Sequence, residues 1–224
     1  MRTTIGQHLK SSPARLATAV AVAVVAVGVD FALVWWDHYL ESVEVRGALA
    51  VAALAAQVRL ANGDLTSVGL RLTPAQGWWY WGRASLLIGL VVLVCLAAGW
   101  GAMALSGWPL PVPATPPSDM FPAFLHMCVF APVHEETIYR LALCLPLAVL
   151  LRPWGAVAVS GMLFGALHWL YGNPSPENQL GGFLLAWAYL KSESIAVPVV
   201  LHGLGNLCAL AAQVVVWYWL HGGL

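Results

Sequence analysis

Two adjacent glutamates and an arginine four residues further on are the residues of this chain best suited to chemistry. Glu135, Glu136 and Arg140 lie near the middle of an apolar run from Phe121 to Leu151. As a helix this run is roughly 46 Å long, which exceeds the ~30 Å hydrocarbon core of a bilayer. An ionisable group at that depth costs at least ~2.5 kcal/mol and is retained mainly for function. The run therefore predicts a site inside a membrane.

The two glutamates are expected to differ in role. Glu136 precedes Arg140 by four residues, which is the favourable orientation for an ion pair on one helix face. A buried salt bridge that only fixes the helix is an equally good interpretation of this pair. Glu135 points about 100° away from Glu136, so spacing offers it no cationic partner. An unpaired carboxylate beside a second one suits a general base, and we expect Glu135 to be catalytic.

Two later apolar segments carry polar residues that can join the glutamates. His168 lies 16 residues after Arg152, and Glu136 lies 16 residues before it. If the chain reverses near Arg152 as a helical hairpin, the histidine and the glutamates return to one depth. His202 and Asn206 are four residues apart and share a helix face, although their depth matches less closely. Carboxylate and histidine can activate a water, and histidine with asparagine can stabilise an oxyanion, so the set predicts hydrolysis.

Metal-dependent chemistry is the alternative that the same residues allow. His134 and Glu135 begin like the zincin helix motif, but Ile138 stands where that motif needs its second histidine. By ligand type, Glu135, His168 and His202 can still hold a metal. The chain contains neither a G-x-S-x-G elbow nor a Gly-rich phosphate loop. We expect hydrolysis that requires no metal and no other cofactor.

The composition is that of an integral membrane protein. The 224 residues are 60% hydrophobic and only 9% charged, against roughly 25% charged in a soluble domain. A net charge of zero argues against a nucleic-acid partner, which would require a basic patch. The cysteines are scattered in apolar runs and predict neither a disulfide framework nor a zinc site.

The apolar segments predict an all-α protein with about seven transmembrane helices and a four-helix catalytic core. We expect an N-terminal membrane region at 1–118 and a catalytic region at 119–224. A cleaved signal peptide is the competing interpretation of the first span, whose length favours a signal anchor. The predicted spans are 16–36, 47–60 (short for a span), 84–105, 121–151, 153–171, 180–190 and 198–219.

The segments between the spans have their own signatures. Residues 61–83 form a polar connector whose aromatic cluster at 78–81 is typical of a membrane interface. Residues 106–119 contain five prolines and predict a stiff loop. Ser118 or Asp119 is expected to cap the helix that follows.

Single residues inside the spans predict local packing. Asp30 is expected to be a hydrogen-bond partner in helix packing. Pro132 frees the carbonyl of Cys128 and predicts a kink or a bound water. Gly161 and Gly165 form a small-residue face that allows another helix to come close.

Basic residues in the loops predict the orientation. Arg46 is the one basic loop residue on the outer side of the seven-span arrangement, so the amino terminus is expected in the cytoplasm. The chain is expected to be a multi-pass protein of a bacterial inner membrane. The basic residues on the inner side are Arg2, Lys10, Arg15, Arg59, Arg71, Arg83, Arg152 and Lys191.

Three ordered motifs resemble a known family. They are E-E-x-x-x-R at 135–140, F-x-x-x-H at 164–168 and H-x-x-x-N at 202–206. Together they resemble the CPBP family of CAAX-prenyl-protease and bacteriocin-processing membrane proteins, also called the Abi family, over roughly residues 119–210. Leu141 departs from the glycine that many members have after the arginine.

This resemblance implies a glutamate-dependent intramembrane endopeptidase. By analogy, Glu135 and His168 activate the water, His202 and Asn206 hold the oxyanion, and Glu136 and Arg140 support them. The implied substrate is a membrane-anchored protein or peptide tail. A prenylated CAAX substrate fits less well, because the Ala/Val/Trp-rich composition is typical of bacteria, which generally lack prenylated proteins.

The rival class is a non-catalytic membrane protein, such as an immunity factor or a small-solute carrier. Intramembrane Glu, His and Arg also line proton and substrate pathways. Many carriers contain inverted repeats, but the E-E-x-x-x-R motif is not repeated in the first half of this chain. That observation disfavours a carrier and leaves a binding protein open.

We predict that hydrolysis survives removal of metal. The failed zincin pattern and the spread of ligand candidates over three helices give the reason. Purified protein treated with a membrane-compatible chelator should keep its peptidase activity. Loss of activity that zinc restores would show instead that the metal-dependent alternative is correct.

Overall fold

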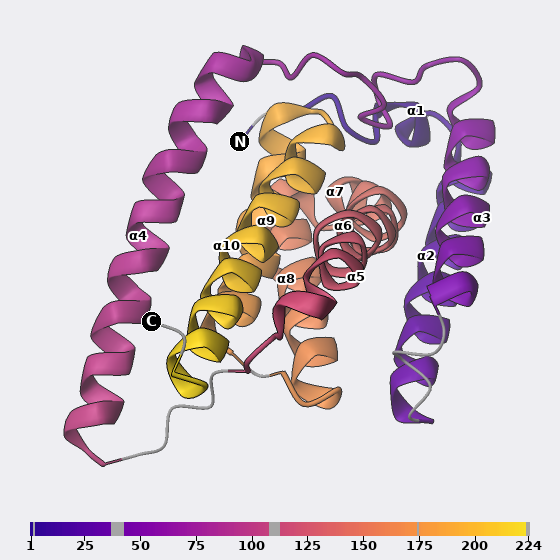
Figure 1. Cartoon of the computed structure of the whole chain (residues 1–224). Coiled ribbons are helices and arrows are strands. Elements are labelled where there is room, and N and C mark those ends of the chain that lie inside the picture. Colours follow the sequence, from indigo (N-terminus) through magenta and orange to yellow (C-terminus); the bar gives the residue numbers. More distant parts are fainter. Residues whose placement is uncertain (2, 37–42, 108–112, 174, 223–224) are drawn as a thin grey trace.

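The protein is a bundle of helices, as the sequence predicts. The computed structural model describes residues 1, 3–36, 43–107, 113–173 and 175–222, and within these ranges it contains no strand. The N-terminal region supplies four helices, and Figure 1 shows α2 and α3 side by side at one edge of the bundle. They are α1 (Gln7–Lys10), α2 (Pro13–Trp35), α3 (Val43–Ala61) and α4 (Gly77–Leu105).

The segment that carries the two glutamates, residues 120–150, is one continuous helix with two π-helical stretches, and we call it the central helix. A short 3₁₀ turn, η1 (Pro117–Asp119), leads into α5 (Met120–Phe124) and the π-helical η2 (Leu125–Phe130). Both glutamates end α6 (Ala131–Glu136), and Arg140 lies in the π-helical η3 (Thr137–Cys144), before α7 (Leu145–Leu150). Such π-helical stretches are rare in proteins overall, and where they occur they are often found at functional sites.

Three further helices complete the bundle. They are α8 (Arg152–Leu170), α9 (Pro176–Ser192) and α10 (Ala196–Leu220). The hairpin predicted near Arg152 is present, and Arg152 adopts the left-handed conformation with φ 63° at the turn.

Small residues bring α8 and α9 together, which confirms the close approach predicted from Gly161 and Gly165. A Cβ added to Gly161 would lie 2.5 Å from the Phe183 ring, and one added to Gly165 would lie 2.6 Å from Gln179 Oε1. On α9, a Cβ at Gly182 would meet the Gly161 carbonyl oxygen at 2.9 Å. Glycine is therefore required at the contact between these helices.

The N-terminal region packs directly on the central helix. One buried cluster joins α2 and α3 to η3 and α8 through Ala23, Ala53, Tyr139 and Phe164. The connector at 62–76 packs on the other end of the core, where Tyr189 donates a 2.6 Å hydrogen bond to the Val68 carbonyl. By contrast, Figure 1 shows α4 at the edge of the bundle opposite α2 and α3, next to α9 and α10.

Several predicted boundaries were wrong. Arg46, predicted in a loop, is helical and 4% exposed, because α3 begins at Val43 and so exceeds the short 47–60 segment. The rest of the predicted loops at 37–46 and 106–119 lies partly outside the described residues. The 61–83 connector ends early, because α4 begins at Gly77 and contains the aromatic cluster. Of that cluster, Trp79 is 80% exposed, but Trp81 is buried against Ala188 and Val197 and anchors α4.

The predicted helix cap before the central helix is also absent. Neither Ser118 nor Asp119 caps it by a side chain, and Ser118 instead donates to the Asp119 carboxylate at 3.0 Å. The 3₁₀ turn makes such a cap unnecessary, because the Met120 N–H already bonds the Pro117 carbonyl.

The chain is an all-α, multi-pass membrane protein. Among the described residues, three helices are long and apolar enough to cross a membrane by length and composition: Pro13–Trp35, the Gly77–Val94 part of α4, and Ala196–Leu220. The count of about seven spans stays a prediction.

A pair of neighbouring glycines tests the contact between α8 and α9. Gly182→Ala places a methyl group against backbone and should destabilise the protein by about 1–3 kcal/mol, as overpacking does. Gly181→Ala meets nothing within 4 Å and should raise stability by up to about 1 kcal/mol through helix propensity. Thermal unfolding in detergent measures both. Equal melting temperatures for the two variants would contradict the packing described.

Candidate active site

Arg140 is completely buried and is held from two helices. Its Nε lies 2.9 Å from Glu136 Oε2, which confirms the ion pair predicted from the spacing of four. Its NH1 donates to Ser160 Oγ on α8 at 2.9 Å, and Ser160 Oγ donates to the Tyr139 carbonyl at 3.0 Å. The guanidinium also lies over the Phe164 ring, 4.8 Å from its centroid. Arg140 thus joins η3 to α8.

Glu135 is not the unpaired carboxylate that spacing predicts. Its Oε1 lies 3.3 Å from NH2 of Arg46, which comes from α3. Arg46 Nε also donates to Asp30 Oδ1 of α2 at 2.7 Å, and the Tyr139 hydroxyl donates to Asp30 Oδ2 at 3.1 Å. The prediction failed because the partner lies 89 residues away in the chain. The hydrogen-bonding role expected for Asp30 is confirmed.

His202 lies between the two glutamates. Its Nδ1 is 2.9 Å from Glu136 Oε1 and its Nε2 is 3.8 Å from Glu135 Oε2. Because a carboxylate only accepts, Nδ1 carries the proton in this hydrogen bond, and Nε2 is the atom turned toward Glu135. The gap in depth expected between α10 and the glutamates is therefore closed in the folded chain.

His168 has its tautomer fixed by the backbone. Its Nδ1 lies 2.9 Å from the Phe164 carbonyl oxygen, which only accepts, so Nδ1 is the protonated nitrogen. In the neutral ring Nε2 is then a base. The Phe164 ring lies 4.3 Å from the His168 ring and 5.8 Å from the His202 ring, so one phenylalanine packs on both histidines.

The register of the hairpin differs slightly from the prediction. Cys144 contacts the Ala156 carbonyl, and Arg140 contacts Ser160, so both pairs are centred on residue 150. Continuing this register puts Phe164 level with Glu136, and His168 lies one turn beyond. The predicted centre of the hairpin, Arg152, lies two residues too far along the chain, because α7 ends at Leu150 and Arg152 is already the first residue of α8.

Asn206 uses a backbone carbonyl that proline sets free. In a π-helix the carbonyl of residue i accepts from the N–H of residue i+5. For Met127 that residue is Pro132, which has no N–H. Asn206 Nδ2 donates to the Met127 carbonyl at 2.6 Å and so takes the vacant position. The sequence predicted a freed carbonyl at Cys128, and the π register moves it by one residue. An amide nitrogen has two hydrogens, so Asn206 keeps one donor for another partner.

The charges of this cluster nearly balance. Three carboxylates (Asp30, Glu135 and Glu136) face two guanidiniums (Arg46 and Arg140), and all five side chains are at most 4% exposed. Within the described part of the chain, no group of three or more His, Cys, Asp or Glu side chains is arranged to hold a metal ion. His134, next to the glutamates, stacks on Phe130 instead. Metal independence stays a prediction.

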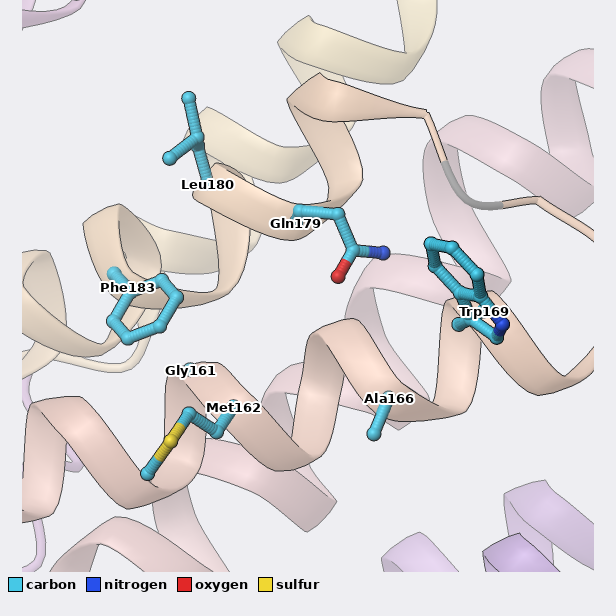
Figure 2. A pocket seen from close by; sticks show the side chains of 7 residues that line it. All are labelled: Gly161, Met162, Ala166, Trp169, Gln179, Leu180 and Phe183. Atoms are coloured by element: carbon cyan, nitrogen blue, oxygen red, sulfur yellow. The ribbon is translucent and has the colours of Figure 1, made fainter.

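A separate cavity of about 350 Å³ is lined by residues of α8 and α9. Figure 2 shows Phe183 and Gln179 pointing from α9 toward α8 there, and none of the seven residues that line it is titratable. This cavity is not the candidate active site, because its lining includes none of the glutamates and histidines to which the chemistry is assigned.

Fold and site together define a polytopic membrane protein with an acid–histidine cluster buried among its helices. Residues 117–208, which are less than half of the chain, match the family model described as type II CAAX prenyl endopeptidase Rce1-like. The match confirms the resemblance drawn from the three motifs and supports, in general terms, a CAAX-type intramembrane protease. No curated protein and no solved structure matches the chain.

The structure joins Glu135, Glu136 and Arg140 to His202 through ion-pair contacts. His168 shares the Phe164 ring with His202, and Asn206 lies one turn from His202 on α10. Sequence reasoning missed the contacts from α2 and α3. A signal was present, because Asp30 and Arg46 are opposite charges in neighbouring apolar helices, and such charges usually pair.

We predict that loss of Arg140 harms folding before chemistry. Arg140→Ala leaves Glu136 without its guanidinium, and breaking a buried pair costs about 3–5 kcal/mol. The melting temperature in detergent should fall and the yield should drop. The double change Glu136→Gln with Arg140→Met removes both charges and should recover part of that loss. An Arg140→Ala protein that melts like the wild type but is inactive would show that Arg140 acts on substrate.

Proposed function

We propose that this protein is an intramembrane endopeptidase that hydrolyses peptide bonds in membrane-anchored protein or peptide tails. The observation that carries the proposal is the convergence of Glu135, Glu136 and His202 from two helices, with His168 of a third helix packed on the Phe164 ring that His202 also contacts, inside the segment that matches the protease family. The reaction needs only water, the substrate and these side chains.

Glu135 and His168 are proposed to activate the water. Glu135 carries a carboxylate oxygen that faces the cluster, and His168 offers Nε2 as a base because its Nδ1–H is held by the Phe164 carbonyl. The water oxygen attacks the carbonyl carbon of the scissile bond while its proton passes to this pair. The same proton then goes to the leaving nitrogen as the carbon–nitrogen bond breaks.

His202 and Asn206 are proposed to stabilise the oxyanion. Both lie on one face of α10 and are more exposed than the glutamates, so they are the side from which a substrate would approach. A protonated His202 would donate from Nε2, and Asn206 has its second amide hydrogen. Glu136 would support this arrangement by accepting from His202 Nδ1 while it holds Arg140.

The location follows from the same physical constraints. A tail anchored in the bilayer reaches carboxylates at this depth without leaving the membrane. We propose a bacterial inner-membrane protein with a cytoplasmic amino terminus. The burial of Arg46 removes the one basic residue that was counted on the outer side, which strengthens the positive-inside argument.

Glu135→Gln and His168→Ala should each abolish cleavage while expression and membrane insertion stay intact. The readout is comparative proteomics of membrane-protein tails in cells that express each variant or the wild type, followed by assay of a candidate tail with purified protein. Glu44→Gln is the matched control, because Glu44 lies on the exposed side of α3. Full cleavage by Glu135→Gln would remove the enzyme interpretation and favour a binding or immunity protein.

A further inference from the structure

We propose that Arg46, supported by Asp30, is a positioning residue that holds the carboxylate of Glu135 in its reactive orientation. This role rests on the proposed peptidase function. It assigns part of the active site to helices α2 and α3, which lie outside the matched segment 117–208.

The contacts form a closed path between three parts of the chain. Arg46 of α3 bonds Asp30 of α2 at 2.7 Å and reaches Glu135 of α6 at 3.3 Å. The Tyr139 hydroxyl, in η3, donates a 3.1 Å hydrogen bond to Asp30, which links α2 back to the central helix. Each member is held by another member, so the guanidinium has little freedom to move.

Close helix packing keeps Arg46 at this distance. A Cβ added to Gly47, the next residue, would lie 3.3 Å from Nε2 of His134, the residue before Glu135. The α3 backbone therefore comes close to α6 beside the charged contact. The burial of Arg46, which is 4% exposed, also excludes a purely surface role for the arginine.

Asp30 is the closer partner of Arg46 and fixes the orientation of the guanidinium. It has two contacts with Arg46, from Nε at 2.7 Å and from NH2 at 3.4 Å. The contact of Arg46 with Glu135 Oε1, at 3.3 Å, is longer than the first of these. Glu135 Oε2 is turned toward His202, at 3.8 Å, which is the side of the proposed water.

The test compares kcat with KM for a cleavable membrane tail. Asp30→Asn with Arg46→Met removes both charges of this pair together, so Asp30 is not left as an unpaired buried carboxylate while Glu135 loses its contact with Arg46. Its kcat should fall at least ~100-fold, the loss expected from about 1 Å of misplacement. KM should stay within about threefold, because neither residue is placed on the substrate.

Arg46→Lys is the conservative second variant and should fold in any case. Lysine keeps a charge for Asp30 but lacks the planar fork that reaches both carboxylates. Its kcat should therefore lie between those of the wild type and the double variant, with KM unchanged. The matched control is Arg71→Met with Glu193→Gln, which removes another Arg–carboxylate contact between the N-terminal region and the core, at 2.9 Å and far from Glu135 in the chain. Its kcat should stay within about twofold of the wild type.

Three results would overturn the role of Arg46. They are a wild-type kcat per folded molecule in the double variant, a raised KM at unchanged kcat, and a full wild-type kcat in Arg46→Lys. Each leaves wild-type cleavage and its dependence on Glu135 intact, so the proposed function would stand. Absence of cleavage by the wild type would instead remove the proposed function, and the role of Arg46 with it.

Discussion

The structure depends on the pairing of buried charges inside an apolar bundle. Five ionisable side chains from α2, α3, α6 and η3 are almost completely enclosed, and removing a charged group from water carries a large desolvation cost. The helices must therefore meet where guanidinium and carboxylate can touch. Because each arginine is shared between elements, the charges that suit the proposed chemistry also hold the helices in place.

Close approach of the helices makes that pairing possible. Glycines at 161, 165 and 182 let α8 and α9 touch, and Gly203 of α10 lies where a Cβ would come within 2.8 Å of the Cys128 carbonyl. The π-helical stretches add a second device, because they redirect backbone carbonyls toward neighbouring helices. Pro132 leaves one such carbonyl for Asn206, so an irregularity of the central helix is matched by a polar side chain of α10.

Much of this protein is determined by its sequence alone. The apolar composition specifies a helical membrane protein, and the spacing of Glu136 and Arg140 specifies an ion pair, because residues four apart meet on any helix. The three motifs are sufficient by themselves to indicate the family, and Gly161 and Gly165 predict the helix contact that α8 makes with α9. These features are local, so their geometry follows from helical periodicity.

Only the tertiary structure decided the partners that come from distant parts of the chain. Arg46 meets Glu135 across 89 residues, and His202 meets Glu136 across 66, and no helical period relates either pair. The same holds for the hairpin register centred on residue 150, which the packing of Ser160 and Cys144 sets. The sequence determined which groups are available to the site, and the packing of helices determined which oxygen of Glu135 faces the arginine and which faces the histidine.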